Sequence, residues 1–384
     1  MAPHCFRARY SGRMKIVFAS DSFKGSLSSE RICALLEEAA AESLPSAECV
    51  SLRMADGGEG TLDAISSVRP GEVLSLYVHD GLMRPLRSGV YLCDDEAFVE
   101  AAATCGLALL KPEECNPLDT TSYGVGECIG HALHHGCTRI AVGLGGSCTN
   151  DGGMGCLRAL GMRFYDKAGQ ELMGRGADLA DVASIDESGL FPQVREASFT
   201  IMSDVTNPLL GPNGATHVFA RQKGATDKTI TQLEAGMNAF ADVVAKTHPS
   251  VDFATPGYGA AGGLGMALSV FLGARVNSGI ETLLAAVDFD ALIADADLVV
   301  TGEGQLDGQS LRGKVISGVS DHAKRAGVPV AAICGRVSLA GEQLRALGLK
   351  CIIEAGAGQT IEQAMNNAEE NYRRAARELF ASLD

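Results

Sequence analysis

Four short segments of this chain combine glycine with acidic, hydroxyl or lysine side chains, and each follows a run of residues typical of a strand. They are residues 21–24, 56–59, 143–153 and 301–307. Glycine-rich loops at helix starts present backbone N–H groups to phosphate oxygens. Phosphoryl transfer needs such donors, a carboxylate-bound Mg²⁺ and a base beside the attacking hydroxyl. One such loop would merely turn the chain, but four favour a phosphate-handling site.

The standard nucleotide motifs are incomplete. Residues 308–314 match the first seven places of a P-loop, but Val315 stands where Ser or Thr should hold Mg²⁺. We therefore interpret that stretch as a chance match, with Lys314 still available to a phosphate or a carboxylate. A dinucleotide fingerprint begins at Gly143, but Cys148 replaces its third glycine, and Asp166 fits a hairpin turn better than a ribose site. An NAD-dependent oxidoreductase is therefore the weaker alternative.

Composition narrows the class of protein. Apolar residues make up 46% of the 384 residues and charged ones 21%, which is typical of a folded domain. The net charge of −15 argues against nucleic acid as a partner, because phosphate backbones are bound by clustered Lys and Arg. No stretch is apolar enough to span a bilayer, so no membrane association is expected. The 12 cysteines are spread singly, which favours a reducing cytoplasm over disulfides or a zinc site.

Predicted strands and helices alternate at both ends of the chain, and these elements must position the loops described above. Residues 15–19 predict a strand, and a helix follows with Ser26 or Ser28 as its N-cap. Strands at 298–301, 328–334 and 351–354 alternate with helices, the last of which is expected over 361–383. Strands are also expected at 139–143 and 198–202, and a long helix at 227–246. Such alternation predicts an α/β fold with a doubly wound parallel sheet.

The middle of the chain lacks this regular alternation, which predicts two domains. We expect residues 14–70 and 290–384 to form one flavodoxin- or Rossmann-like domain from both chain ends. Residues 71–289 would be an inserted α/β domain, and residues 1–13 an N-terminal extension with Met14 as the natural start. Ligands of a doubly wound sheet bind beyond the carboxyl ends of its strands, where the loops described above would cluster.

These loops resemble the bacterial glycerate kinase family, of the type that includes glycerate 2-kinases. The matching stretches include residues 21–25, 55–61, 121–127, 145–153, 222–225, 259–263, 278–281 and 301–304. The departures are Ser20, Cys148, Ser203 and Ile316, none of which removes a charged group. The resemblance implies transfer of the terminal phosphoryl group of ATP to glycerate, with Mg²⁺ as cofactor and 2-phosphoglycerate favoured. It also implies a restriction-endonuclease-like fold for the inserted domain. A kinase for another short hydroxy acid stays open, as does a homodimer.

Residue type and loop position predict the individual roles, with ATP·Mg²⁺ and glycerate meeting between the domains. Asp204 is the expected base that orients the attacking hydroxyl, with Asp151 as its rival, and Lys24 and Lys314 would neutralise anionic groups. The phosphate cradle is expected from Gly145, Gly146, Ser147, Asn150, Gly152 and Gly153. Substrate contacts are expected from Asp21, Ser22, Lys223 and Asp307, and Mg²⁺ ligands from Asp56, Glu59 and Glu303.

Overall fold

A computed structural model describes residues 13–55, 60–308, 310 and 314–383. The chain divides into two compact units, each of which mixes helices with a mainly parallel sheet. The first unit comprises Met1–Asp56, Asp63–Arg69 and Gly279–Asp384, and the second comprises Gly57–Leu62 and Pro70–Ser278. The predicted α/β class with two domains is therefore confirmed. Among the described residues, no helix has both the length and the apolar character needed to cross a membrane.

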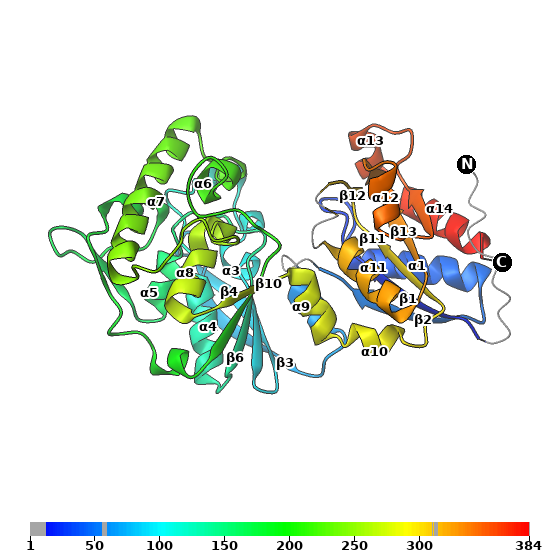
Figure 1. The fold of residues 1–384 in the computed structure, drawn as a ribbon, viewed down its shortest axis with the longest axis horizontal. Helices are drawn as coiled ribbons and strands as arrows, with labels where there is room; N and C mark the ends of the chain where they lie inside the picture. Colours follow the sequence, from blue (N-terminus) through cyan, green and yellow to red (C-terminus); the bar gives the residue numbers. More distant parts are fainter. Residues whose placement is uncertain (1–12, 56–59, 309, 311–313, 384) are drawn as a thin grey trace. The chain divides into compact units, whose positions relative to one another are not determined.

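The first unit is built on five parallel strands (Figure 1). They are β1 (Lys15–Ser20), β2 (Glu48–Arg53), β11 (Leu298–Gly302), β13 (Val330–Cys334) and β15 (Cys351–Glu354). Their spatial order is β15-β13-β11-β1-β2. Counted within this sheet alone the order is 2-1-3-4-5, one of the two common orders of doubly wound sheets. Successive strands are therefore added in one direction from β1 to β2 and in the opposite direction from β11 to β15, so the winding reverses between β1 and β11. Doubly wound sheets bind their ligands at such a point.

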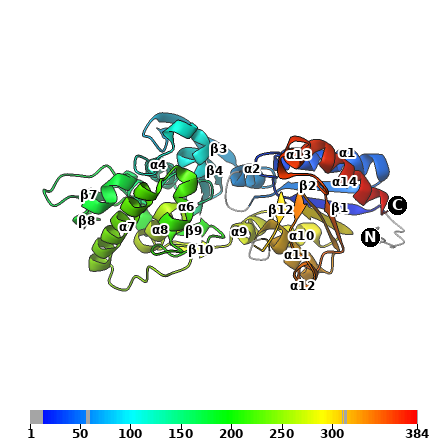
Figure 2. The ribbon, with the colours of Figure 1, turned by 90° about the horizontal axis from the view of Figure 1, so that it is seen from above.

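Helices cover both faces of this sheet (Figure 2). Helices α1 (Ser29–Ser43) and α14 (Ala368–Ala381) bury Leu36 and Phe380 against Phe18 on one face. Helices α11 (Val315–Ala326) and α12 (Glu342–Ala346) lie on the other face, where Ile316 packs with Cys334. Because both faces are covered, β11 and β13 are buried along their whole length, as their continuous apolar sequences require.

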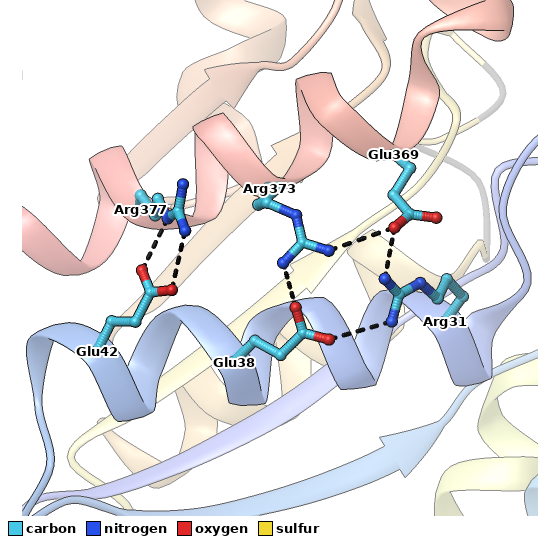
Figure 3. A network of polar contacts seen from close by, with 6 residues as sticks. All are labelled: Arg31, Glu38, Glu42, Glu369, Arg373 and Arg377. Atoms are coloured by element: carbon cyan, nitrogen blue, oxygen red, sulfur yellow. Dashed lines mark hydrogen bonds and ion pairs between the residues drawn. The ribbon is translucent and has the colours of Figure 1, made fainter.

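Helices α1 and α14 also meet through charged side chains (Figure 3). Arg31 donates to Glu38 and Glu369, Arg373 donates to the same two carboxylates, and Arg377 holds Glu42 in a bidentate pair. The six side chains are partly or largely exposed, so water and salt screen their attraction. The buried apolar faces of the two helices, rather than these ion pairs, are therefore the main source of their association.

The prediction of one helix over residues 361–383 is wrong. The segment forms two helices, α13 (Ile361–Asn366) and α14, separated at Asn367, where φ is −106° and ψ is 19°. The Asn367 carbonyl accepts the N–H of Asn371 and so begins α14. Asparagine favours helix ends because its short polar side chain competes for backbone hydrogen bonds. The break lets α13 leave the direction that α14 follows along the core.

The second unit contains a six-stranded mixed sheet in the order β10-β9-β6-β5-β4-β3. Its strands are β3 (Glu72–His79), β4 (Pro85–Cys93), β5 (Glu96–Glu100), β6 (Arg139–Gly143), β9 (Ser198–Met202) and β10 (Arg275–Asn277). Strands β5, β6, β9 and β10 are parallel, whereas β3, β4 and β5 are antiparallel. The carboxyl ends of the four parallel strands therefore share one edge. The strands predicted at 139–143 and 198–202 are confirmed.

Helices of the second unit enclose a core around this sheet. They include α4 (Tyr123–His134), α5 (Met154–Ala159), α7 (Asp227–Thr247) and α8 (Leu264–Leu272). The shorter elements of the chain are α2 (Thr61–Ser66), α3 (Ala102–Cys105), β7 (Arg163–Tyr165), β8 (Ser184–Asp186), α6 (Ala215–Phe219), α9 (Gly279–Ala286), α10 (Phe289–Ile293), β12 (Gln305–Leu306) and β14 (Arg336–Val337). Helix α7 matches the helix predicted at 227–246, and Thr226 caps its start.

Candidate functional site

A pocket of about 580 Å³ opens at the carboxyl edge of the first unit's sheet. Its walls come from the carboxyl ends of four of the parallel strands: residues 21–24 after β1, 303–305 after β11, 335–336 after β13, and 354–356 at the end of β15 and just beyond it. The pocket therefore includes the point between β1 and β11 where the winding reverses. Doubly wound sheets bind their ligands at this position.

Six of the residues predicted to act lie around this pocket. They are Asp21, Ser22, Lys24, Glu303, Asp307 and Lys314. Two further candidates, Asp56 and Glu59, lie outside the described residues. Segments separated by almost 300 residues in the chain thus meet because β1 pairs directly with β11.

The two buried carboxylates of this pocket lie directly after β1 and β11. Asp21 Oδ1 accepts the N–H of Ser22 at 2.7 Å, and the Asp21 N–H donates to the carbonyl of Gly302 at 2.9 Å. Glu303 is also buried, and its Oε2 lies 4.0 Å from Nζ of Lys314, the residue that precedes α11. The pocket therefore pairs negative charge with lysine at the ends of neighbouring strands.

These carboxylates fit Mg²⁺ that arrives with a nucleotide. Mg²⁺ prefers oxygen ligands and is usually held by one or two carboxylates together with substrate phosphates and water. Glu303 and Asp21 supply that donor type inside the pocket. Within the described part of the chain there is no cluster of three or more His, Cys, Asp or Glu able to hold a metal.

Sequence reasoning missed several residues of this pocket. Arg336 follows β13 at the same edge, and Gln359, Asn371 and Met365 line the side nearest α13 and α14. Arg336 carries the same signal as the residues that were found, since it comes directly after a buried parallel strand and a glycine. The pocket residues of α13 do not follow a strand, and the prediction of one continuous helix over 361–383 gave no reason to place them at a ligand site.

In the second unit, the glycine loop of residues 144–153 connects β6 to α5. The loop lies along the segment that follows β5: the Cys148 N–H donates to Cys105 at 2.7 Å, and Gly146 accepts the N–H of Leu107 at 2.8 Å. Gly146 is exposed and Gly145 half-buried, whereas the following residues are buried. Only the start of the predicted phosphate cradle, Gly145 to Ser147, therefore lies at or next to the surface.

The remaining cradle residues make hydrogen bonds inside the unit. The Gly152 N–H donates to Gly262 at 3.0 Å, the Gly153 N–H donates to Asp151 Oδ1 at 3.0 Å, and Asn150 Nδ2 donates to Thr216 at 3.2 Å. A Cβ on Gly153 would lie only 2.3 Å from the Cβ of Ala267 on α8. These glycines therefore permit close packing, and their N–H groups already have acceptors.

Asp151 is completely buried beneath this loop. Its Oδ2 accepts the N–H and the hydroxyl of Ser122, both at 2.8 Å, and the N–H of Gly155 at 3.2 Å, while Oδ1 accepts from Gly153. Burial raises the pKa of the Asp151 carboxyl, and these hydrogen bonds oppose that shift. With four donors around it and no exposed surface, Asp151 is suited to holding the loop.

Lys223 is a buried cation directly behind the exposed part of the loop. It lies in a short 3₁₀ helix, Arg221–Lys223. Its Nζ donates to the carbonyl of Thr149 at 2.6 Å and to Oγ of Ser147 at 3.2 Å. Burial lowers the pKa of Lys223 to about 8. The ammonium group thus supports Ser147 from inside and places positive charge beneath the loop.

Asp204 lies at the same edge of the second sheet as the glycine loop. Met202 at the end of β9 is paired with Gly143 at the end of β6, and Gly143 is paired with Glu100 at the end of β5. Asp204 follows β9 by two residues and is half-buried. Glu100, which sequence reasoning missed, is buried and accepts the N–H of Leu62 at 2.8 Å. Glu100 could have been identified in the sequence as an acidic residue at the end of the apolar run of β5.

Comparisons with known proteins agree with this architecture. Residues 16–384 match the model of the glycerate kinase family. The chain is 41% identical to a glycerate kinase of Bacillus subtilis (strain 168) over 373 residues, which cover 96% of this chain and 98% of the relative. It is 40% identical to glycerate 2-kinase of Escherichia coli (strain K12) over 374 residues, with the same coverage.

A solved structure shares the fold over nearly the whole chain. It is the crystal structure of a protein from Salmonella typhimurium LT2 whose assignment as glycerate kinase 2 is itself provisional. The TM-score is 0.82 at 40% sequence identity, and the match covers 97% of this chain and 98% of the other. With a family match over most of its residues and relatives near 40% identity, the chain belongs to the glycerate kinase family.

Proposed function

We propose that this protein is a glycerate kinase that transfers the terminal phosphoryl group of ATP to glycerate, with 2-phosphoglycerate as the product. The observation that carries the proposal is the pocket of the first unit. Asp21, Lys24, Glu303 and Lys314 line this pocket, which includes the point between β1 and β11 where the winding of the sheet reverses. The chain that contains it belongs to the glycerate kinase family. The name of the Escherichia coli relative, glycerate 2-kinase, supports the choice of the 2-hydroxyl.

Phosphoryl transfer requires little covalent chemistry from the protein, so positioning and charge carry the catalysis. Lys24 and Lys314 would neutralise the transferring phosphoryl group and the substrate carboxylate. Mg²⁺, when bound, would neutralise charge on the phosphate oxygens. Glu303 would hold it, and Asp56 and Glu59 stay candidates outside the described residues. Asp21, Ser22 and Asp307 would contact the substrate or its phosphate through the same pocket.

The second unit would supply the base and further phosphate donors. Asp204 would accept the proton of the attacking hydroxyl, because it is half-buried and follows a parallel strand. The backbone N–H groups around Gly145 and Gly146, and the side chain of Ser147, would contact phosphate oxygens, with Lys223 stabilising Ser147 through the 3.2 Å hydrogen bond. Asp151, Asn150, Gly152 and Gly153 would hold this loop in shape rather than touch the ligand.

Finer features of the fold and setting belong to the same proposal. A flavodoxin-like first unit is supported by its 2-1-3-4-5 strand order. A restriction-endonuclease-like second unit is supported by the family resemblance. We propose a cytoplasmic enzyme whose partners are glycerate and ATP, because its co-substrate ATP is a cytoplasmic metabolite. Mass measurement in solution would distinguish a monomer from the homodimer that we leave as the alternative.

The proposal is tested by ADP release from ATP, Mg²⁺ and D-glycerate, with enolase as the coupling enzyme for the second product. Enolase converts 2-phosphoglycerate directly, so immediate phosphoenolpyruvate is the expected result. ADP without phosphoenolpyruvate would show that the 3-hydroxyl is the acceptor. Absence of ADP release with glycerate, but not with another short hydroxy acid, would overturn the substrate assignment. Reactions without glycerate measure the background ATP hydrolysis.

A further inference from the structure

The pocket of the first unit is much larger than glycerate needs. Its volume of about 580 Å³ falls in the range of about 300–1,000 Å³ that is typical of sites for drug-sized ligands. A short hydroxy acid would fill only a small part of it. The space can therefore accommodate a larger ligand, and the polarity of its walls indicates which kind.

One wall of the pocket is apolar and belongs to α13. Ile361, Ala364 and Met365 lie three or four residues apart, so they share one face of α13, and all three line the pocket. Ala368, the first residue of α14, lines it too. Ile361 is 61% exposed and Met365 44% exposed, although both are large apolar residues. An apolar helix face that borders a pocket instead of the core suits an apolar or aromatic ligand group, and methionine adapts well to aromatic rings.

The start of this wall is capped by side-chain hydrogen bonds. Thr360 Oγ1 accepts the N–H of Gln363 at 3.2 Å, and Gln363 Oε1 accepts the N–H of Thr360 at 3.1 Å, which caps the start of α13. Cε of Met365 would lie 3.2 Å from a Cβ at Gly25, a residue with a φ of 81°. The loop after β1 therefore comes close to the apolar face, and the positive φ of residue 25 favours glycine there.

An amide pair lies beside the apolar wall. Gln359 and Asn371 donate to each other's carbonyl oxygens, each at 3.0 Å. This reciprocal pairing uses one N–H and one lone pair of each amide and leaves one donor and one acceptor on each. Both residues line the pocket. Adjacent donors and acceptors next to an apolar surface complement the edge of a purine base.

Cations occupy the part of the pocket nearer the centre of the sheet. Lys24 follows β1, Lys314 precedes α11, and Arg336 follows β13. Strand β15, from which the chain continues to α13, is the edge strand next to β13. The pocket thus combines cations after β1, after β13 and before α11 with the carboxylates after β1 and β11, and its apolar wall on α13 brings Met365 close to the loop after β1.

We propose that this pocket is the nucleotide site, with the adenine base against Ile361 and Met365 of α13 and the phosphates toward Lys24, Lys314 and Arg336. The inference rests on the proposed function for its choice of ATP, and it deepens that proposal by assigning the base to one helix. Glycerate would then use only the end of the pocket near Glu303, or groups outside it.

The test is calorimetric titration of the full-length protein with ADP, adenosine and inorganic tripolyphosphate, all without glycerate. The neutral double variant Ile361→Ser/Met365→Gln removes the apolar wall without adding charge. We expect the Kd for ADP and for adenosine to rise by about tenfold or more, which corresponds to about 1.4 kcal/mol. The Kd for tripolyphosphate should stay unchanged, and Met365→Leu should keep ADP affinity.

The matched control is Met173→Gln, a methionine that is 51% exposed in the second unit. It should leave all three affinities as in the wild type. Unchanged ADP and adenosine affinity in the double variant would overturn the inference, as would an equal loss of tripolyphosphate binding. Because no glycerate is present, an ADP affinity that depends on α13 would stand even if glycerate proved not to be the acceptor. Conversely, glycerate turnover with an unaffected double variant would sink only the assignment of the base site.

Discussion

Asp151 and Ser122 are joined by two hydrogen bonds in the interior of the second unit, since Asp151 Oδ2 accepts both the N–H and the hydroxyl of Ser122 at 2.8 Å. The Ser122 hydroxyl in turn accepts the N–H of Cys156 at 3.0 Å. Ser122 precedes α4, and Cys156 lies in the first turn of α5. This pair therefore links the starts of two helices to the glycine loop between β6 and α5.

Replacing Asp151 by Asn should destabilise the second unit. The amide NH₂ of asparagine would take the place of one carboxylate oxygen. At least one buried group that now donates to Asp151 would then lose its acceptor, and a buried donor left unsatisfied costs about 1–3 kcal/mol. Because the chain contains no tryptophan, urea unfolding is best followed by far-UV circular dichroism. Asp181→Asn, at an exposed position of the same unit, is the control and should change the free energy of unfolding little. Equal stability of both variants would contradict a structural role for Asp151.

Replacing Asp204 by Asn should remove the proposed base while keeping the size of the side chain. General base catalysis typically contributes about 10²–10⁴-fold to a rate, so kcat should fall within that range. The ADP-release assay at saturating ATP and glycerate measures it. The expected pattern is a fall in kcat with normal unfolding by urea, the reverse of what we expect for Asp151→Asn. A full rate in Asp204→Asn would eliminate this residue as the base.

The rate should decline above about pH 8 because of Lys223. Burial lowers the pKa of Lys223 to about 8, so its ammonium group is lost as the pH rises through that value. The positive charge beneath Ser147 is then lost, and kcat/KM should fall on the alkaline side. In Lys223→Arg the guanidinium stays charged, so this decline should disappear even if the absolute rate is lower. The same alkaline decline in both proteins would exclude Lys223 as its cause.

The lowered pKa of Lys223 should also make the free energy of unfolding rise with pH. Between about pH 8 and the ordinary lysine value of about 10.4, the unfolded chain binds more protons at this residue than the native state does. The free energy of unfolding therefore gains a contribution that rises with pH over that window. Lys223→Met should remove this rise, which urea unfolding at pH 7.5 and at about pH 10 would measure. A rise of equal size in the variant would contradict the assignment.

Replacing Glu303 by Gln should raise the Mg²⁺ concentration needed for half-maximal rate. Loss of groups that support a metal typically costs about 10–100-fold in metal affinity, and a direct ligand should cost at least as much. Thermal stabilisation by ADP with increasing Mg²⁺ provides a reading independent of turnover. Glu342→Gln, at an exposed glutamate in the first turn of α12, is the control. Identical Mg²⁺ dependence in both variants would rule out Glu303 as a ligand.

Local patterns in the chain predicted many of the elements. The apolar runs at 139–143 and 198–202 became β6 and β9, and the apolar periodicity after Thr226 became α7. The helix expected after residues 15–19 became α1, and Ser28, one of its two predicted N-caps, caps it. These predictions succeed because strand alternation, helical periodicity and N-caps depend on residues close in sequence. The break at Asn367 escaped them, since the apolar face of α13 continues the pattern of α14.

The sequence by itself determined the fold class, the family resemblance and the loops that carry acidic, lysine and glycine residues. Only the tertiary structure decided which of those residues meet and which are buried. Asp21 and Glu303 gather in one pocket because β1 pairs with β11 across the chain, whereas Asp151 and Gly153 point into the core despite having the residue types of a ligand site. A carboxylate or a glycine has the same local sequence signal in both settings. Its exposure and its partners are set by strands and helices distant in sequence, because burial and hydrogen bonding depend on everything that packs around the side chain.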